Sequence, residues 1–425
     1  MQKKLIALAV AGLVSGGAFA QTNVTMYGIV DVGVEMGNSG FGSKTRIQSG
    51  QSAGNRLGFK GEEALGGGTS VMFQLETGFT LDNGNLSNNS SHLSSFSTGG
   101  AAGLNTGSIA GVPQGTGAGL FQRTAIAGLK GGWGTLTVGR QYAPEFLVTA
   151  AVDPFAAGLG GNNGVVLGGA GFAQRLDNSV MYVSPNMSGF SGGLGYSSGV
   201  ENNMNADSAA AGVPAGPCAA TTCTNDKAGK AWALLATYAN GPAYVGLGYH
   251  NVNGSTYDST AAANQTGLSK SKSWLLGASW DFQVVKLSGT YFTGNTDQPG
   301  SVDASAGAAL VSPTVGKTTD VRAYTIGLKA PMGPWTFNAV YGKRDDKTAR
   351  DADYSTFSIG GEYALSKRTA LYGAYTKLNN ADRTNAAGVV RGAGQVINSA
   401  LNTGLVNTNG NNDPNALQLG MRHSF

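Results

Sequence analysis

The stretch Asn415–Phe425 reads N-A-L-Q-L-G-M-R-H-S-F, and its alternation guides the interpretation of the whole chain. Leu417, Leu419, Met421, His423 and Phe425 fall on one side of a period of two, and small or polar residues fall on the other. This pattern predicts a β-strand with one apolar face and one polar face. Such a terminal strand can close a sheet by pairing with the first strand, provided that the other segments alternate in the same way.

The N-terminus has the three parts of a secretory signal peptide. Lys3 and Lys4 precede an uncharged apolar run, Leu5–Val14, and Ala18-Phe19-Ala20 has the small-residue pattern of a cleavage site. The apolar run is too short to span a bilayer. We therefore expect residues 1–20 to be a signal peptide, rather than a buried N-terminal helix, and residues 21–425 to form one exported domain.

The composition is poor in charge and rich in glycine. Lys and Arg number 28 against 24 Asp and Glu, and removal of Lys3 and Lys4 lowers the net charge from +4 to about +2. This balance gives no support to nucleic-acid binding. Beyond the signal, no run of apolar residues approaches the roughly 18 that a membrane-spanning helix needs. An exported chain can still cross a membrane as a β-barrel, in which apolar and polar residues alternate.

Two cysteines, Cys218 and Cys223, lie close together in P-C-A-A-T-T-C-T. In an exported protein we expect them to form a disulfide that closes a small loop, although the sequence leaves their oxidation state open. A metal site would need further Cys or His residues nearby, and the sequence has none there. No metal or other cofactor is therefore expected.

Segments with period-two alternation follow one another along the whole mature chain, joined in strict turn by short turns and long loops. The predicted strands are Val24–Met36, Asn55–Glu62, Thr69–Asp82, Phe121–Leu129, Gly134–Tyr142, Arg175–Ser184, Phe190–Ser198, Trp232–Ala239, Ala243–Asn253, Ser273–Asp281, Val284–Gly294, Val321–Lys329, Trp335–Arg344, Tyr354–Leu365, Thr369–Leu378 and Asn415–Phe425. Short turns at one end and long loops at the other are typical of outer-membrane barrels and unusual for a soluble β-sandwich. We therefore predict a 16-stranded antiparallel transmembrane β-barrel with both termini on the periplasmic side.

Several stretches carry a family resemblance. They are Val24-Thr-Met-Tyr-Gly-Ile-Val-Asp31, Asn55-Arg-Leu-Gly-Phe-Lys-Gly61, Gly139-Arg-Gln-Tyr142, Leu365-Ser-Lys-Arg-Thr369 and Gly420-Met-Arg-His-Ser-Phe425. Together they resemble the trimeric general porins of β-proteobacterial outer membranes. The resemblance implies a homotrimer in contact with outer-membrane lipid and lipopolysaccharide. It also implies a third outer loop folded into the pore, and a terminal Phe425 read by the outer-membrane assembly machinery.

The resemblance also implies a set of pore residues. By its order in the chain, Ala143–Ala173 corresponds to the inward-folded loop, so its carboxylates Glu145 and Asp153 are expected to face basic side chains of the barrel wall. The candidate basic residues are Arg56, Lys60, Arg123, Arg140 and Arg175, of which Arg140 alone shares its strand face with apolar neighbours. Met181 and Val183 stand where the family usually carries Arg and Asp, which lowers the charge of this wall.

Wall cations opposite two loop carboxylates predict a water-filled channel for ions and small hydrophilic solutes, with a mild anion preference. The lumenal carboxylates Asp31, Glu35, Glu62 and Glu76 could neutralise the cations, so the sign of the selectivity stays open. A substrate-specific channel for small sugars or carboxylates is the alternative. A sugar channel would want a line of lumenal aromatic residues, which Tyr244, Tyr372 and Phe155 do not make.

An enzyme of the outer membrane is a third class to weigh. Such a site needs a nucleophile beside an oriented base. The three histidines, His92, His250 and His423, lie on three distant segments, and no pattern joins them to a nucleophile. We therefore expect no catalytic residues.

Overall fold

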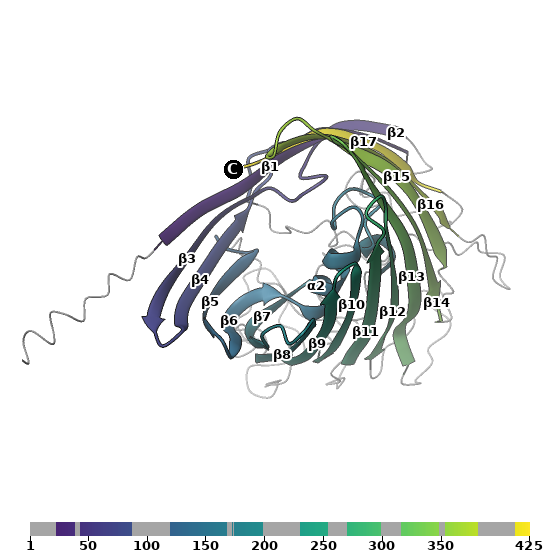
Figure 1. Ribbon diagram of the computed structural model, residues 1–425. Helices are drawn as coiled ribbons and strands as arrows, with labels where there is room; N and C mark the ends of the chain where they lie inside the picture. The colour runs from purple at the N-terminus through teal and green to yellow at the C-terminus, as the bar shows by residue number, and fades with distance from the viewer. Residues whose placement is uncertain are drawn as a thin grey trace, which may run out of the picture.

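The computed structural model describes residues 23–38, 43–86, 120–167, 172, 174–198, 230–253, 270–298, 316–347, 353–380 and 413–425. The expected signal peptide (1–20), the pair Cys218 and Cys223, and His92 lie outside these residues. Within the described ranges, seventeen antiparallel strands form a single sheet that curves round and closes on itself (Figure 1).

The strands are β1 (Asn23–Asn38), β2 (Ser43–Ser49), β3 (Arg56–Gly66), β4 (Thr69–Gly78), β5 (Thr124–Gly131), β6 (Gly134–Tyr142), β7 (Arg175–Val183), β8 (Phe190–Ser198), β9 (Lys230–Asn240), β10 (Ala243–Asn253), β11 (Lys270–Asp281), β12 (Lys286–Gln298), β13 (Gly316–Met332), β14 (Trp335–Asp346), β15 (Tyr354–Ala364), β16 (Thr369–Asn380) and β17 (Asn415–Ser424). Two helices, α2 (Pro144–Val152) and α3 (Gly164–Leu167), lie between β6 and β7.

The first and last strands close the barrel. β1 pairs with β17 from Ile29 opposite Ser424 to Asn38 opposite Asn415. The pairing extends to Phe425, whose N–H donates to the Gly28 carbonyl at 3.1 Å and whose carbonyl accepts from the Gly28 N–H at 3.0 Å. An unpaired backbone group in lipid costs several kcal/mol, so this closure is a requirement of the fold. The predicted pairing of the terminal strand with the first is confirmed.

The second position of the barrel is shared by two strands. β3 pairs with the first half of β1, from Asn23 to Ile29, and β2 pairs with the second half, from Val32 to Asn38. Seventeen strands therefore occupy sixteen positions, as predicted, but the strand Ser43–Ser49 was not among the predicted strands. Between β2 and β3, residues 50–55 leave the sheet, and three of their N–H groups donate to the carboxylate of Asp31 at 2.8–3.0 Å.

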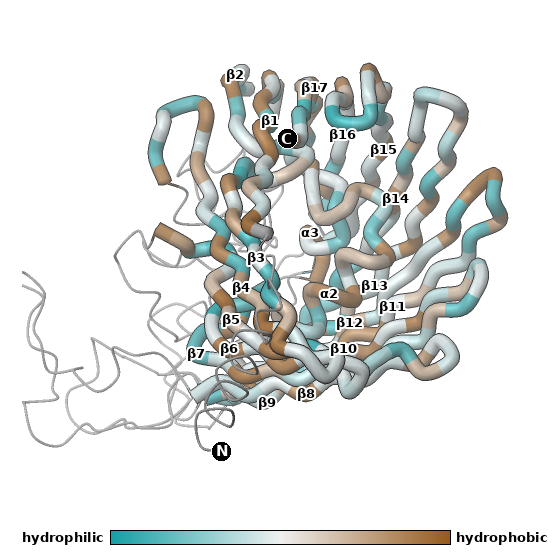
Figure 2. Tube along the Cα trace, turned by 60° about the vertical axis from the view of Figure 1, so that its left-hand side comes forward, coloured by the Kyte–Doolittle hydropathy of each residue, from teal (hydrophilic) through white to brown (hydrophobic). Residues whose placement is uncertain are grey.

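The two faces of the sheet differ as the alternation requires. In β11, Trp274 and Leu276 on the outer face are 45% and 46% exposed, whereas Ser273 and Leu275 on the inner face are completely buried. Apolar and polar residues alternate along the strands in the same way (Figure 2). The outer face is therefore a hydrocarbon-facing surface, and the polar face lines the lumen.

No helix in the described ranges is long and apolar enough to span a membrane.

The segment that follows β6 lies inside the barrel. α2 contacts β9, β10, β11 and β12 (Figure 1), and α3, labelled in Figure 2, contacts β13, β14 and β15. These contacts involve the lumenal face: a Cβ added at Gly246 or Gly277 would meet Val148 of α2 at 3.0 or 2.8 Å. Glycine at these two positions lets the helix approach the wall closely. The segment thereby narrows the lumen opposite β1–β6.

Candidate pore constriction

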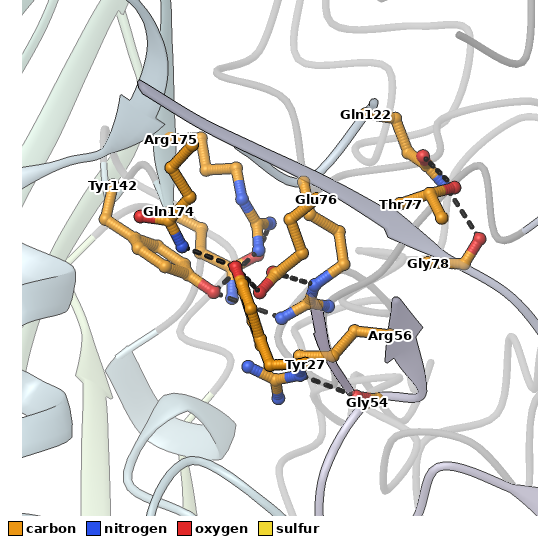
Figure 3. A network of polar contacts seen from close by, with 12 residues as sticks. Tyr27, Gly54, Arg56, Glu76, Thr77, Gly78, Gln122, Tyr142, Gln174 and Arg175 are labelled. Carbon is orange, nitrogen blue, oxygen red and sulfur yellow. Dashed lines mark hydrogen bonds and ion pairs between the residues drawn. The ribbon is translucent and has the colours of Figure 1, made fainter. Parts of the chain in front are cut away.

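Three arginines converge on the inner face of the wall, near the first residues of α2. Arg56 begins β3, Arg123 precedes β5 and Arg175 begins β7. Figure 3 shows Arg56 and Arg175 on either side of Glu76 and Tyr27. Arg123 Nε lies 2.5 Å from Glu76 Oε1, in an ion pair whose side chains are both nearly buried. The Nη2 atoms of Arg123 and Arg175 donate to the Tyr142 hydroxyl oxygen at 3.1 and 3.0 Å.

Arg56 completes this group, called the arginine cluster below. Its Nε donates to the Gly54 carbonyl at 3.0 Å, and its charge interacts with those of Arg123 and Glu76. Glu76 also accepts a hydrogen bond of 3.1 Å from the Tyr27 hydroxyl, which in turn accepts one of 2.6 Å from Gln74. Counted over Arg56, Arg123, Arg175 and Glu76, three guanidinium groups and one carboxylate leave an excess of two positive charges.

The other two predicted basic residues have contacts of their own, although the charge of Arg140 also acts on that of Arg175. Lys60 is exposed, with its Nζ 5.4 Å from the centroid of the Tyr27 ring. Arg140 donates to the Gln122 carbonyl at 2.6 Å and forms an ion pair with Asp177. The register of β6 shifts after Gly139, where φ is +118°, and this irregularity directs Arg140 to its own partners.

The two loop carboxylates are buried away from the lumen. Glu145 Oε2 lies 3.0 Å from His250 Nδ1 of β10, and both side chains are completely buried. Asp153 accepts hydrogen bonds from the N–H groups of Phe155, Ala157 and Asn163 at 2.9–3.1 Å. Burial raises the pKa of Asp153 to about 6 despite these hydrogen bonds. The expectation that both carboxylates face the basic wall is corrected, because each is used to hold the loop.

Sequence reasoning found the arginines and the lumenal carboxylate Glu76, but not Gln74 or Tyr142. Period two places Gln74 on the same lumenal face as Glu76, so Gln74 could have been assigned to the site from the sequence. Tyr142 could not, because the irregularity after Gly139 breaks the alternation just before it. In the described residues, no group of three or more His, Cys, Asp or Glu side chains is placed to hold a metal ion.

A closed barrel with an apolar outer face, a polar inner face and a charged constriction defines a pore-forming protein of the outer membrane. The model of the Gram-negative porin family matches residues 7–383. An outer membrane porin protein of Bordetella pertussis is 32% identical over 411 residues, which cover 89% of this chain and 94% of that protein. The outer membrane porin protein 32 of Delftia acidovorans is 29% identical over 441 residues and is covered completely, as is this chain.

A solved structure supports the same assignment. The anion-selective porin from Comamonas acidovorans superposes with a TM-score of 0.67 at 25% identity, over 95% of this chain and 100% of that one. The chain therefore belongs to the Gram-negative porin family. It is a general diffusion porin of the cell outer membrane, which passes ions and small hydrophilic solutes.

Proposed function

We propose that this porin prefers anions and that Arg56, Arg123 and Arg175 set the preference. The observation that carries the proposal is the charge balance of the arginine cluster. Its three guanidinium groups are accompanied by one carboxylate, that of Glu76. A local excess of positive charge in a narrow passage concentrates anions and repels cations. The related porin from Comamonas acidovorans is described as anion-selective, which is the same direction of selectivity.

In this proposal the loop carboxylates are supports and contribute little to the field along the passage. Glu145 is tied to His250, and Asp153 caps the turn that follows α2. Lys60 adds a positive charge on the same strand face as Arg56, whereas Arg140 is balanced by Asp177. The chain has no catalytic role, and solutes pass unchanged.

The assembled form is also a proposal. We infer a homotrimer embedded in outer-membrane lipid and lipopolysaccharide, with Phe425 read by the assembly machinery. Phe425 directly follows β17, the strand that closes the barrel against β1, and is 42% exposed. Its ring packs on Gly28 so closely that a Cβ added at Gly28 would lie 2.4 Å from the ring. Because this aromatic ring is exposed and lies where β17 meets β1, it suits binding by the assembly machinery before the barrel closes.

The test is the reversal potential of reconstituted channels in a KCl gradient, measured for matched substitutions. Arg56→Gln and Arg175→Gln each remove one charge from the cluster and should lower the anion-to-cation permeability ratio about two- to fivefold, since each removed charge changes the local potential for both ions. Lys130→Gln removes the same charge from the exposed ion pair with Glu62 and should change the ratio much less, because water screens that charge. Equal effects of all three substitutions would show that the cluster does not set the selectivity.

A further inference from the structure

The exposed side chains in the described part of the inward-folded loop are apolar, and near the end of α2 the Ala151 carbonyl accepts a hydrogen bond of 3.3 Å from Lys286 Nζ. Across the described part of this loop, residues 143–167, the exposed positions are Leu147, Ala150, Ala151 and Ala156. Leu147 is the largest of these side chains and is 36% exposed. The loop's carboxylates are both buried, so its exposed side chains carry no charge.

The exposed residues of α2 form one face, and this face is turned to the lumen. Residues three and four apart on a helix lie on the same side, which groups Leu147, Ala150 and Ala151. The opposite side carries Glu145 and Val148, which contact the wall at His250 and Gly246. The side of α2 that faces away from the wall of β9–β12 faces the open passage.

This apolar face begins beside the arginine cluster. Phe146 stacks on Tyr142 with ring centroids 4.8 Å apart and an interplanar angle of 17°. The hydroxyl of the same Tyr142 accepts from Arg123 and Arg175, and the Arg175 guanidinium carbon lies 4.5 Å from the ring centroid. Leu147 follows Phe146 directly in the chain. The apolar face of α2 and the positive charges of the arginine cluster therefore lie at the same depth in the pore.

We propose that this juxtaposition favours small monocarboxylates with a short alkyl chain over compact anions of equal charge. The carboxylate is attracted by the arginine cluster, as a charge-assisted hydrogen bond to a guanidinium allows. The alkyl chain lies along Leu147 and Ala150, where it leaves water. A dicarboxylate gains less, because its second charge would lie against hydrocarbon and lose hydration. The inference rests on the anion preference proposed above and names the solute class that uses it.

The experiment measures how strongly acetate, propionate and butyrate reduce the chloride conductance of the reconstituted channel at constant potassium activity. Each added methylene should lower the half-blocking concentration about twofold. This factor corresponds to roughly half of the free energy gained when a methylene group is buried completely. Leu147→Asn should abolish the dependence on chain length, and Leu147→Met should retain it. Leu65→Asn, at an exposed apolar residue near the β3–β4 turn, is the matched control and should also retain it.

Two outcomes would overturn the inference. One is a wild-type series in which the half-blocking concentration stays equal or rises with chain length. The other is a Leu147→Asn channel that keeps the wild-type series. The KCl reversal potential separates the two proposals: a cation-selective channel refutes the anion preference, whereas an anion-selective channel without a chain-length series refutes this inference alone.

Discussion

Replacing Glu76 with glutamine should make the channel more anion-selective. Glu76 is the carboxylate of the arginine cluster, and its Oε1 lies 2.5 Å from Arg123 Nε. Glutamine keeps one oxygen that can still accept from Arg123, and its NH2 group can donate to the Tyr27 hydroxyl oxygen, so the substitution removes charge with little change in shape. The net charge of the cluster rises from two to three, counted over Arg56, Arg123, Arg175 and position 76.

The size of the effect follows from the distance to a passing ion. One unit charge about 5 Å away is worth about 0.8 kcal/mol in bulk water, and about 0.1 M salt reduces this to about 0.5 kcal/mol. That energy favours an anion and disfavours a cation by about twofold each. The permeability ratio should therefore rise about two- to fivefold.

The assay is the reversal potential in a KCl gradient, with Glu62→Gln as the matched control. Glu62 has the same charge and lies on the same barrel wall, but it pairs with Lys130 in an exposed ion pair at 2.5 Å. Screening by water should make its removal much less effective. A Glu62→Gln channel that shifts the ratio as much as Glu76→Gln, or a Glu76→Gln channel that becomes less anion-selective, would refute the reasoning.

Three further outcomes concern assembly and the loop. Deleting Phe425 should reduce the yield of folded trimer on semi-native gels without changing the conductance of the channels that form; a normal yield would place the assembly signal elsewhere. His250→Ala should increase open-channel current noise, because leaving the buried Glu145 without this hydrogen-bond partner costs about 1–3 kcal/mol, and His250→Gln, which keeps a donor, should increase it less. Asp153 has a folded-state pKa of about 6, above its ordinary value of 3.8, so its contribution to stability is complete below about pH 4 and is lost as the pH rises through about 6. Asp153→Asn should remove this part of the pH dependence of Tm, and an unchanged dependence would exclude Asp153 as its source.

The barrel could be predicted from the sequence because period two reports which face a strand residue occupies. Leu417 and Leu419 lie outside and Gln418 inside, as their alternation requires. The exception is β2, in which Ile47 is the only large apolar outward residue, so the alternation is weak. Residues 50–55 then leave the sheet because Asp31 supplies acceptors for their N–H groups, a long-range interaction that no local pattern shows.

The residues of the pore constriction could be predicted from the sequence only where they lie on regular strands. Arg56 and Glu76 follow from alternation. Asp153 is held by N–H groups of its own loop, and the direction of Glu145 depends on which side of α2 meets the wall. That choice is made by Gly246, Gly277 and His250, more than ninety residues away in sequence. The loop therefore turns Glu145 toward the wall, holds Asp153 within its own turn, and leaves Leu147, Ala150 and Ala151 exposed on the side of the lumen.

The central claim, an anion preference set by the arginine cluster, is tested most directly by the zero-current potential of the wild-type channel between concentrated and dilute KCl. Chloride that crosses more readily than potassium makes the dilute side negative, and this is the sign that the charge balance of Arg56, Arg123, Arg175 and Glu76 predicts. A dilute side that becomes positive would contradict the account.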